Sequence, residues 1–145
     1  MVAHDLIVKR SELDRSLSGP RCKDNLGVKA VSELLGIARF TFHEDKVEDF
    51  KRLSEQCMEI VRTQDTGTLQ YAIYFNDEES EAIVIERYRD SEALVEHVAH
   101  VGSDLMAAMM TTAAVYGETL GEPSAQLRAM MEDTPVRILT PFLSL

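Results

Sequence analysis

The feature that most limits how this chain of 145 residues can fold is the order in which strand-like and helix-like hydrophobic patterns follow each other. Four short stretches have the composition and pattern of strands: residues 37–43, 69–75, 82–88 and 115–121. Two longer stretches carry apolar side chains every three or four residues, as amphipathic helices do: residues 47–61 and 91–114. The order along the chain is therefore β-α-β-β-α-β.

This order matches the ferredoxin-like split βαβ arrangement, an α+β fold with a four-stranded antiparallel sheet and both helices on one face. A short helix over residues 123–131 and an extended segment over 135–143 follow. The second face of such a sheet needs a cover, and a chain of this length has little left to supply one. We therefore expect a homodimer in which two sheets pack together.

Polar residues and glycines mark the ends of the predicted elements. Asp45 is expected to cap the first helix with Glu48 as its reciprocal partner, and Gly67 is expected to end it in the left-handed conformation. Asp90 is expected to cap the second helix, which Gly102 interrupts. Alternation predicts one strand face formed by four residues: Leu69, Tyr71, Ile73 and Phe75.

The first part of the chain has a different character from the rest. Gly19-Pro20 breaks any regular element there, and polar residues and glycine follow through residue 27. We predict that residues 1–32 form an N-terminal arm and that residues 33–145 form the folded domain.

The charge balance excludes several classes of partner. Fifteen Lys and Arg against 25 Asp and Glu give a net charge of -10, so the chain repels phosphate backbones and we expect no nucleic-acid partner. No apolar run approaches the roughly 18 residues that span a bilayer, and we expect no membrane partner. Cys22 and Cys57 have no metal-ligand spacing and form no disulfide framework, which favours the reducing cytoplasm.

Three stretches of the domain carry a family resemblance: Thr68-Leu69-Gln70-Tyr71, the run from Glu86 to His97, and Gly121-Glu122-Pro123-Ser124. They resemble the antibiotic biosynthesis monooxygenase family, in particular its quinol monooxygenase branch, and the similarity covers residues 33–145. The resemblance implies that two ferredoxin-like sheets close into a dimeric α/β barrel. It also implies oxidation of phenols, anthrones or quinols by O₂ with neither metal nor flavin, so no cofactor is expected.

Such an oxygenase needs a base that removes a phenolic proton, because a phenolate gives an electron to O₂ more readily than a phenol does. His97 is the predicted base, since imidazole titrates near ~6.5 and the family carries a histidine at this place. Glu86 is the second catalytic candidate, because enclosure in a barrel raises the pKa of a carboxyl group. The alternatives are a His97 that bonds a backbone carbonyl and a Glu86 paired with Arg39 or Arg87.

Side chains on neighbouring strands are candidates for the rest of the site. Tyr88, which stands where the family commonly has tryptophan, is predicted to donate to the developing oxyanion, and Arg39 is a second candidate for that role. Tyr71 and Tyr74 are predicted to bind the ring of the substrate, but their opposite parity lets only one face the barrel interior. Arg39 and Thr41 share a strand face, and the sequence leaves open whether that face points inward.

Two further patterns are interpreted as structural. His97 and His100 form an HxxH pair, but the zinc signature HExxH and a third ligand are missing, so no metal site is predicted. The methionines near the end of the domain are interpreted as core or dimer-interface packing, because methionine fills irregular gaps: Met106, Met109, Met110, Met130 and Met131.

The sequence thus predicts a cofactor-independent monooxygenase that oxidises a quinol or phenolic aromatic, with a small aromatic or quinone-like molecule as its partner. The alternative is a non-catalytic dimeric barrel that binds a small hydrophobic ligand or a protein. A cavity beside His97 with polar groups converging on it would favour the enzyme, whereas a fully packed interior would favour the alternative.

Overall fold

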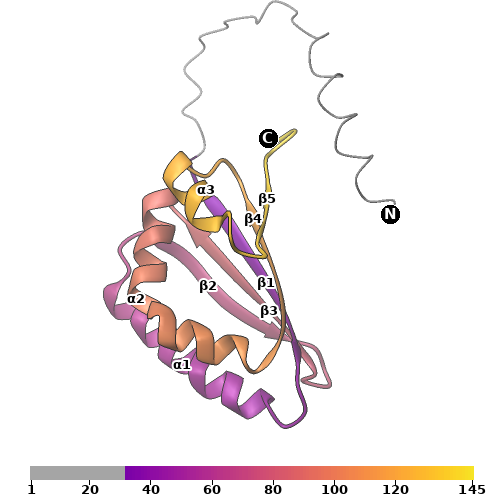
Figure 1. Cartoon of the computed structure of the whole chain (residues 1–145). Coiled ribbons are helices and arrows are strands. Elements are labelled where there is room, and N and C mark those ends of the chain that lie inside the picture. Colours follow the sequence, from indigo (N-terminus) through magenta and orange to yellow (C-terminus); the bar gives the residue numbers. More distant parts are fainter. Residues whose placement is uncertain (1–31) are drawn as a thin grey trace, which may run out of the picture. The chain divides into compact units, whose positions relative to one another are not determined.

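The computed structural model describes residues 32–145, which form helices on one side of a five-stranded sheet (Figure 1). In chain order the elements are β1 (Leu34–Phe42), α1 (Val47–Gln64), β2 (Thr68–Phe75), β3 (Glu81–Tyr88), α2 (Ser91–Met110), β4 (Ala113–Leu120), α3 (Ala125–Met131) and β5 (Arg137–Leu139). The predicted arm, residues 1–32, lies outside the described residues except for Ser32. Within the described part, no helix is long and apolar enough to cross a membrane.

The strands lie in the order β2-β3-β1-β4-β5, and the first four are antiparallel neighbours. This arrangement confirms the predicted α+β, ferredoxin-like fold class. The sheet is nevertheless mixed and not wholly antiparallel as predicted, because β5 runs parallel to β4. The reason is α3, which carries the chain across between β4 and β5 and lets these consecutive strands point in the same direction.

The core lies between α1, α2 and the face of the sheet that they cover (Figure 1). Phe50 of α1 is fully buried, and its ring centroid is 4.8 Å from those of Phe40 and Phe42 on β1. Burying a side chain of this size contributes about 2–3 kcal/mol relative to exposing it. The apolar stripe predicted on the first helix therefore does form the core.

The residues predicted to mark the two ends of the first helix, Asp45 and Gly67, do not do so. Asp45 has a φ of 58° and precedes the N-cap position, which Lys46 occupies without a capping side-chain bond. At the other end, α1 stops before Asp65, whose backbone is already extended. Gly67 instead allows close packing, because a Cβ atom there would collide with Ala93 on α2.

The start and the interruption of α2 are as predicted. Asp90 caps the helix, since its Oδ1 accepts a hydrogen bond from the backbone N–H of Ala93 at 2.9 Å. Gly102 breaks the helical geometry with a φ of 74° and a ψ of 162°, a conformation that glycine adopts readily. The helix therefore bends around the core before it ends at Met110.

A bulge at the beginning of β2 changes one predicted strand face. The pairing of β2 with β3 shifts register between Thr68 and Gln70, so Leu69 leaves the alternation and is 46% exposed. The other predicted members keep their shared face against the core: Tyr71, Ile73 and Phe75.

No helix of the described part covers the opposite side of the sheet, which we call the open face (Figure 1). Strand alternation and register bring apolar side chains together there: Ile37, Ala72, Tyr74, Ile83, Ile85 and Tyr116. Arg39 and Thr41 lie on the same face and are exposed. The structure therefore has the uncovered apolar face from which the homodimer was predicted.

Candidate functional site

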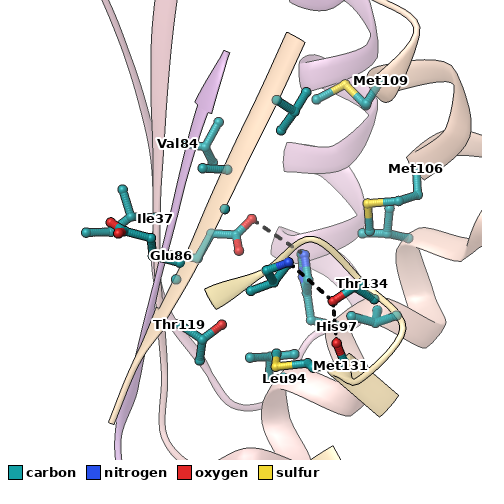
Figure 2. Close-up of a pocket in the computed structure, with 18 of the residues that line it drawn as sticks. Ile37, Val84, Glu86, Leu94, His97, Met106, Met109, Thr119, Met131 and Thr134 are labelled. Atoms are coloured by element: carbon teal, nitrogen blue, oxygen red, sulfur yellow. Dashed lines mark hydrogen bonds and ion pairs between the residues drawn. The ribbon is translucent and has the colours of Figure 1, made fainter. Parts of the chain in front are cut away.

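A cavity of about 420 Å³ lies between the helix-covered face of the sheet, α2 and α3 (Figure 2). Its floor is formed by residues with little or no side chain, Gly36 and Ala38 of β1 and Gly117 of β4. A Cβ atom at Gly36 would stand 3.1 Å from Oε2 of Glu86, and one at Gly117 would stand 3.3 Å from Cγ2 of Val136. The absent side chains on these paired strands therefore let Glu86 and Val136 pack closely over the floor of the cavity.

Apolar side chains form most of the cavity wall, and the methionines are prominent among them: Met106, Met109, Met110, Met130 and Met131. Met109 is also part of the core, as predicted, whereas Met106, Met110 and Met130 are between 38% and 45% exposed. The interpretation of all five as packing residues is therefore incomplete. Flexible thioether side chains provide an adaptable apolar surface for a ligand.

His97 lies on the inner side of α2 and is only 4% exposed. Its Nδ1 atom is 2.8 Å from Oδ2 of Asp65. Its Nε2 atom faces Glu86 (Figure 2), at 3.9 Å from Oε1. The ring therefore bonds a carboxylate and not a backbone carbonyl, which was the alternative considered from the sequence. Because Asp65 occupies Nδ1, Nε2 is the nitrogen that is available to the cavity.

Asp65 anchors this histidine from the segment between α1 and β2. Its side chain is 1% exposed and has three hydrogen-bond partners: Thr68 at 2.7 Å, His97 at 2.8 Å and His100 at 2.8 Å. Burial by itself raises the pKa of Asp65, but the hydrogen bonds from His100, His97 and Thr68 outweigh burial and hold the pKa below its usual value. Asp65 is therefore a buried anion.

The same bonds account for the HxxH pair. His97 and His100 stand three residues apart on α2, and both turn Nδ1 toward Asp65. Within residues 32–145, no group of three or more histidine, cysteine, aspartate and glutamate side chains is arranged to hold a metal ion. In this structure, His97 and His100 both form a hydrogen bond with the carboxylate of Asp65.

Glu86 projects from β3 into the cavity beneath α2. It lies on the helix-covered face of the sheet, so the expectation that it points into a barrel formed by two sheets is wrong. Oε2 accepts a hydrogen bond from the Tyr88 hydroxyl at 2.9 Å. The alternative ion pair with arginine is not formed, because Arg87 contacts Glu33 and Arg39 lies on the open face.

The pKa of Glu86 is shifted in the opposite direction from that of Asp65. Burial raises the pKa of Glu86, and the two groups that favour its anion, His97 and the hydroxyl of Tyr88, do not offset burial. Environments that shift the pKa values of two carboxyl groups in opposite directions are typical of sites that carry out acid–base chemistry.

Two of the predicted tyrosines lie beside His97. The ring centroid of Tyr88 is 5.4 Å from that of His97, and the ring centroid of Tyr71 is 5.9 Å away. Burial raises the pKa of both phenols, so both remain neutral hydrogen-bonding groups. Tyr71 lines the cavity, whereas Tyr74 is 55% exposed on the open face, in agreement with their opposite parity.

The structure separates the remaining predicted substrate-binding residues from this site. Arg39, Thr41 and Tyr74 all lie on the open face, on the far side of the sheet from His97. They cannot reach the cavity through the sheet. Their predicted role in substrate binding, and that of Arg39 with an oxyanion, gains no support from the cavity.

Two residues of the site, Asp65 and Thr119, were not predicted from the sequence. Asp65 follows a helix, where polar residues are common, and nothing in the sequence connects it with a histidine 32 positions later. Thr119 is 3% exposed, lines the cavity, and its hydroxyl forms no hydrogen bond within residues 32–145 (Figure 2). Thr119 could have been predicted, because alternation along the predicted fourth strand places it on the same face as Val115 and Gly117.

Comparison with known families agrees with this geometry. The family model described as antibiotic biosynthesis monooxygenase matches residues 35–112, more than half of the chain. This protein belongs to the antibiotic biosynthesis monooxygenase family. The matched region contains Asp65, Glu86 and His97, whereas Thr119 and α3 lie beyond it. The family resemblance seen in the sequence is thereby confirmed over residues 35–112.

Solved structures support the fold of this family member. MupZ from Pseudomonas fluorescens is 20% identical, with a TM-score of 0.69 over 79% of this chain and 88% of that chain. Rv0793 from Mycobacterium tuberculosis is 26% identical, with a TM-score of 0.53 over 64% and 97%. SnoaB from Streptomyces nogalater, a cofactor-independent oxygenase, is 13% identical, with a TM-score of 0.52 over 65% and 96%. No curated protein sequence matches significantly.

Proposed function

We propose that this protein is a cofactor-independent monooxygenase that oxidises a quinol or phenolic aromatic with O₂ in the cavity beside His97. The observation that carries the proposal is the pair of cavity-facing atoms, Nε2 of His97 and Oε1 of Glu86, in a mostly apolar cavity. Their separation of 3.9 Å is too long for a hydrogen bond between them. One oxygen atom of a ligand can lie at hydrogen-bonding distance from both.

The first step assigned to this pair is removal of the hydroxyl proton of the substrate. The Nδ1–H of His97 donates to Asp65, which fixes the tautomer in which Nε2 accepts a proton. Asp65 then stabilises the imidazolium that forms. The product of this step is a phenolate, which gives electrons to O₂ more readily than the phenol.

Glu86 and Tyr88 hold the developing negative charge. Burial raises the pKa of Glu86 and its Oε2 accepts from Tyr88, so we assign the acidic proton of Glu86 to Oε1, from which it donates to the oxygen of the substrate. Tyr88 thus acts by positioning Glu86 more than by direct contact with the oxyanion. A preorganised donor in an apolar surrounding stabilises an oxyanion more strongly than water does.

The overall reaction balances without an external reductant. The quinol or phenol loses four electrons, one oxygen atom of O₂ enters the ring and the other leaves as water. The mostly apolar wall of the cavity reduces contact between bulk water and the phenolate. Family membership, together with the oxygenase activity named for SnoaB, supports this reaction class.

The quaternary structure is part of the proposal. Two copies of this chain pack their open faces together and form a dimeric α/β barrel, which covers Ile37, Ile83 and Ile85. The cavity then lies outside the barrel, within each subunit. A cytoplasmic location, inferred from the cysteine usage, belongs to the same proposal.

The test is O₂ uptake by the metal-free protein with a panel of reduced quinols and anthrone-like phenols. We expect uptake above the autoxidation rate, and a decrease of about 10²- to 10⁴-fold in His97→Ala. His43→Ala is the matched control, because His43 is exposed and outside the cavity. Uptake that is equal in both variants would remove His97 from the mechanism. Binding of the quinols without any uptake would contradict the oxygenase and favour the non-catalytic ligand-binding barrel.

A further inference from the structure

Two imidazole rings share one buried carboxylate in this structure. Oδ2 of Asp65 is 2.8 Å from Nδ1 of His97, and Oδ1 is 2.8 Å from Nδ1 of His100. The proposed mechanism uses only the first of these contacts. His100 therefore requires a separate explanation.

The two histidines differ in their access to water. The side chain of His97 is 5% exposed and that of His100 is 28% exposed, while that of Asp65 is 1% exposed. A buried carboxylate needs a compensating positive charge, and a single imidazolium is enough to supply it. An imidazolium at His100 keeps part of its hydration, whereas one at His97 loses nearly all of it.

We propose that His100 supplies the positive charge that compensates Asp65 and thereby leaves His97 neutral. His100 is then a positioning residue that acts through Asp65 and does not touch the substrate. The consequence for catalysis rests on the proposed function, because only a neutral His97 can accept a proton. The charge distribution itself does not depend on that function.

The other groups around His97 do not take the place of Asp65. The titratable side chains that face it come from several elements: Asp65 after α1, Tyr71 on β2, Glu86 and Tyr88 on β3, and His100 on α2 itself. The thiol of Cys57 on α1 lies next to Tyr71, and burial raises the pKa of this thiol. Burial likewise favours the neutral forms of Glu86 and of both tyrosines. Asp65 is therefore the anion that His97 and His100 share.

Removing the charge at His100 should transfer it to His97. In His100→Gln, the side-chain amide can still donate to Asp65, but among residues 32–145 the other basic side chain bonded to this carboxylate is that of His97. His97 then holds a proton to higher pH. In the enzyme, the acidic limb of the kcat/KM profile moves to higher pH in the same direction.

The experiment is a pH titration of the histidine ring signals by NMR in the full chain. In the wild type, we expect the His100 signal to titrate at higher pH than the His97 signal. In His100→Gln, we expect the His97 midpoint to rise by about one pH unit or more. In His100→Arg, a permanent charge should return the His97 midpoint to the wild-type position or below it. His43→Gln is the control and should leave the His97 midpoint unchanged.

A His97 midpoint that stays constant or falls in His100→Gln would overturn the inference, as would a wild-type His97 that titrates above His100. The wild-type order of titration tests the inference even if a variant fails to fold. Since these signals are observed without turnover, the result is separate from the O₂-uptake test. A shifted midpoint in an inactive protein supports the shared charge and contradicts the oxygenase, whereas activity without a shift contradicts only the role of His100.

Discussion

The two faces of the sheet come from the same strands but carry different chemistry. The helix-covered face combines a mostly apolar cavity with an anionic Asp65, a Glu86 whose pKa burial raises, and two histidines. The open face presents aliphatic and aromatic side chains together with Arg39, and no helix of the described part covers it. A strand can thus supply a site on one side and an association surface on the other, because successive side chains point in opposite directions.

Loss of the charge on Asp65 should have the largest effect on the covered face. In Asp65→Asn, the amide nitrogen faces one of the two imidazoles and the anion that stabilises His97 as an imidazolium is gone. We expect kcat/KM for quinol oxidation to fall about 10²-fold or more. Asp77→Asn, in an exposed turn, is the control, and full activity in Asp65→Asn would show that the site works without the buried anion.

A charge on the open face should separate the subunits while leaving the cavity intact. Ile85→Glu places a carboxylate where we expect two sheets to meet, at a cost of about 3 kcal/mol, or roughly 100-fold in the dissociation constant of the dimer. Light scattering coupled to size exclusion measures the mass. Gln56→Glu adds the same charge on the exposed side of α1 and should remain dimeric. A dimeric Ile85→Glu would move the interface elsewhere.

A smaller effect on the covered face should follow from Thr119. In Thr119→Val the volume is conserved, but the hydroxyl that points into the cavity is lost. We expect KM for an oxygen-bearing substrate to rise about fivefold, the worth of one hydrogen bond, with little change in kcat. Thr41→Val removes a hydroxyl from the open face of the same sheet and should change neither constant. Equal KM values in all three proteins would exclude Thr119 from ligand binding.

The smallest expected effect is the pH-dependent loss of folding stability that the buried carboxyl group of Glu86 causes. The folded-state pKa of Glu86 is raised, so the unfolded chain ionises this carboxyl first and the fold loses stability as pH rises through the folded value. Glu86→Gln removes this loss, so its Tm should exceed that of the wild type at pH 8 and approach it at pH 5. Glu81→Gln, exposed on the same strand, should show no such trend. A Tm difference that does not depend on pH would argue that Glu86 is ionised in the fold.

Much of the fold follows from local pattern. Alternation and helical periodicity predict the order of the elements, and Asp90 and Gly102 mark the start and the bend of α2 because caps and kinks depend on neighbouring residues. The direction of β5 does not follow, since it depends on how α3 crosses the sheet edge. The displaced Leu69 does not follow either, because a bulge is set by pairing with a second strand.

For the site, the residue types that carry acid–base chemistry could be selected from the chain, and His97, Glu86, Tyr88 and Tyr71 do meet around one cavity. Which face of the sheet they occupy was beyond local pattern, because alternation gives relative parity and not the side on which the helices pack. The contact of Asp65 with two histidines joins parts of the chain 32 and 35 residues apart, and only the packing of α1 against α2 brings them together. The pKa values of Asp65 and Glu86 are shifted in opposite directions for the same reason, since hydrogen bonding and burial, not residue type, determine these shifts.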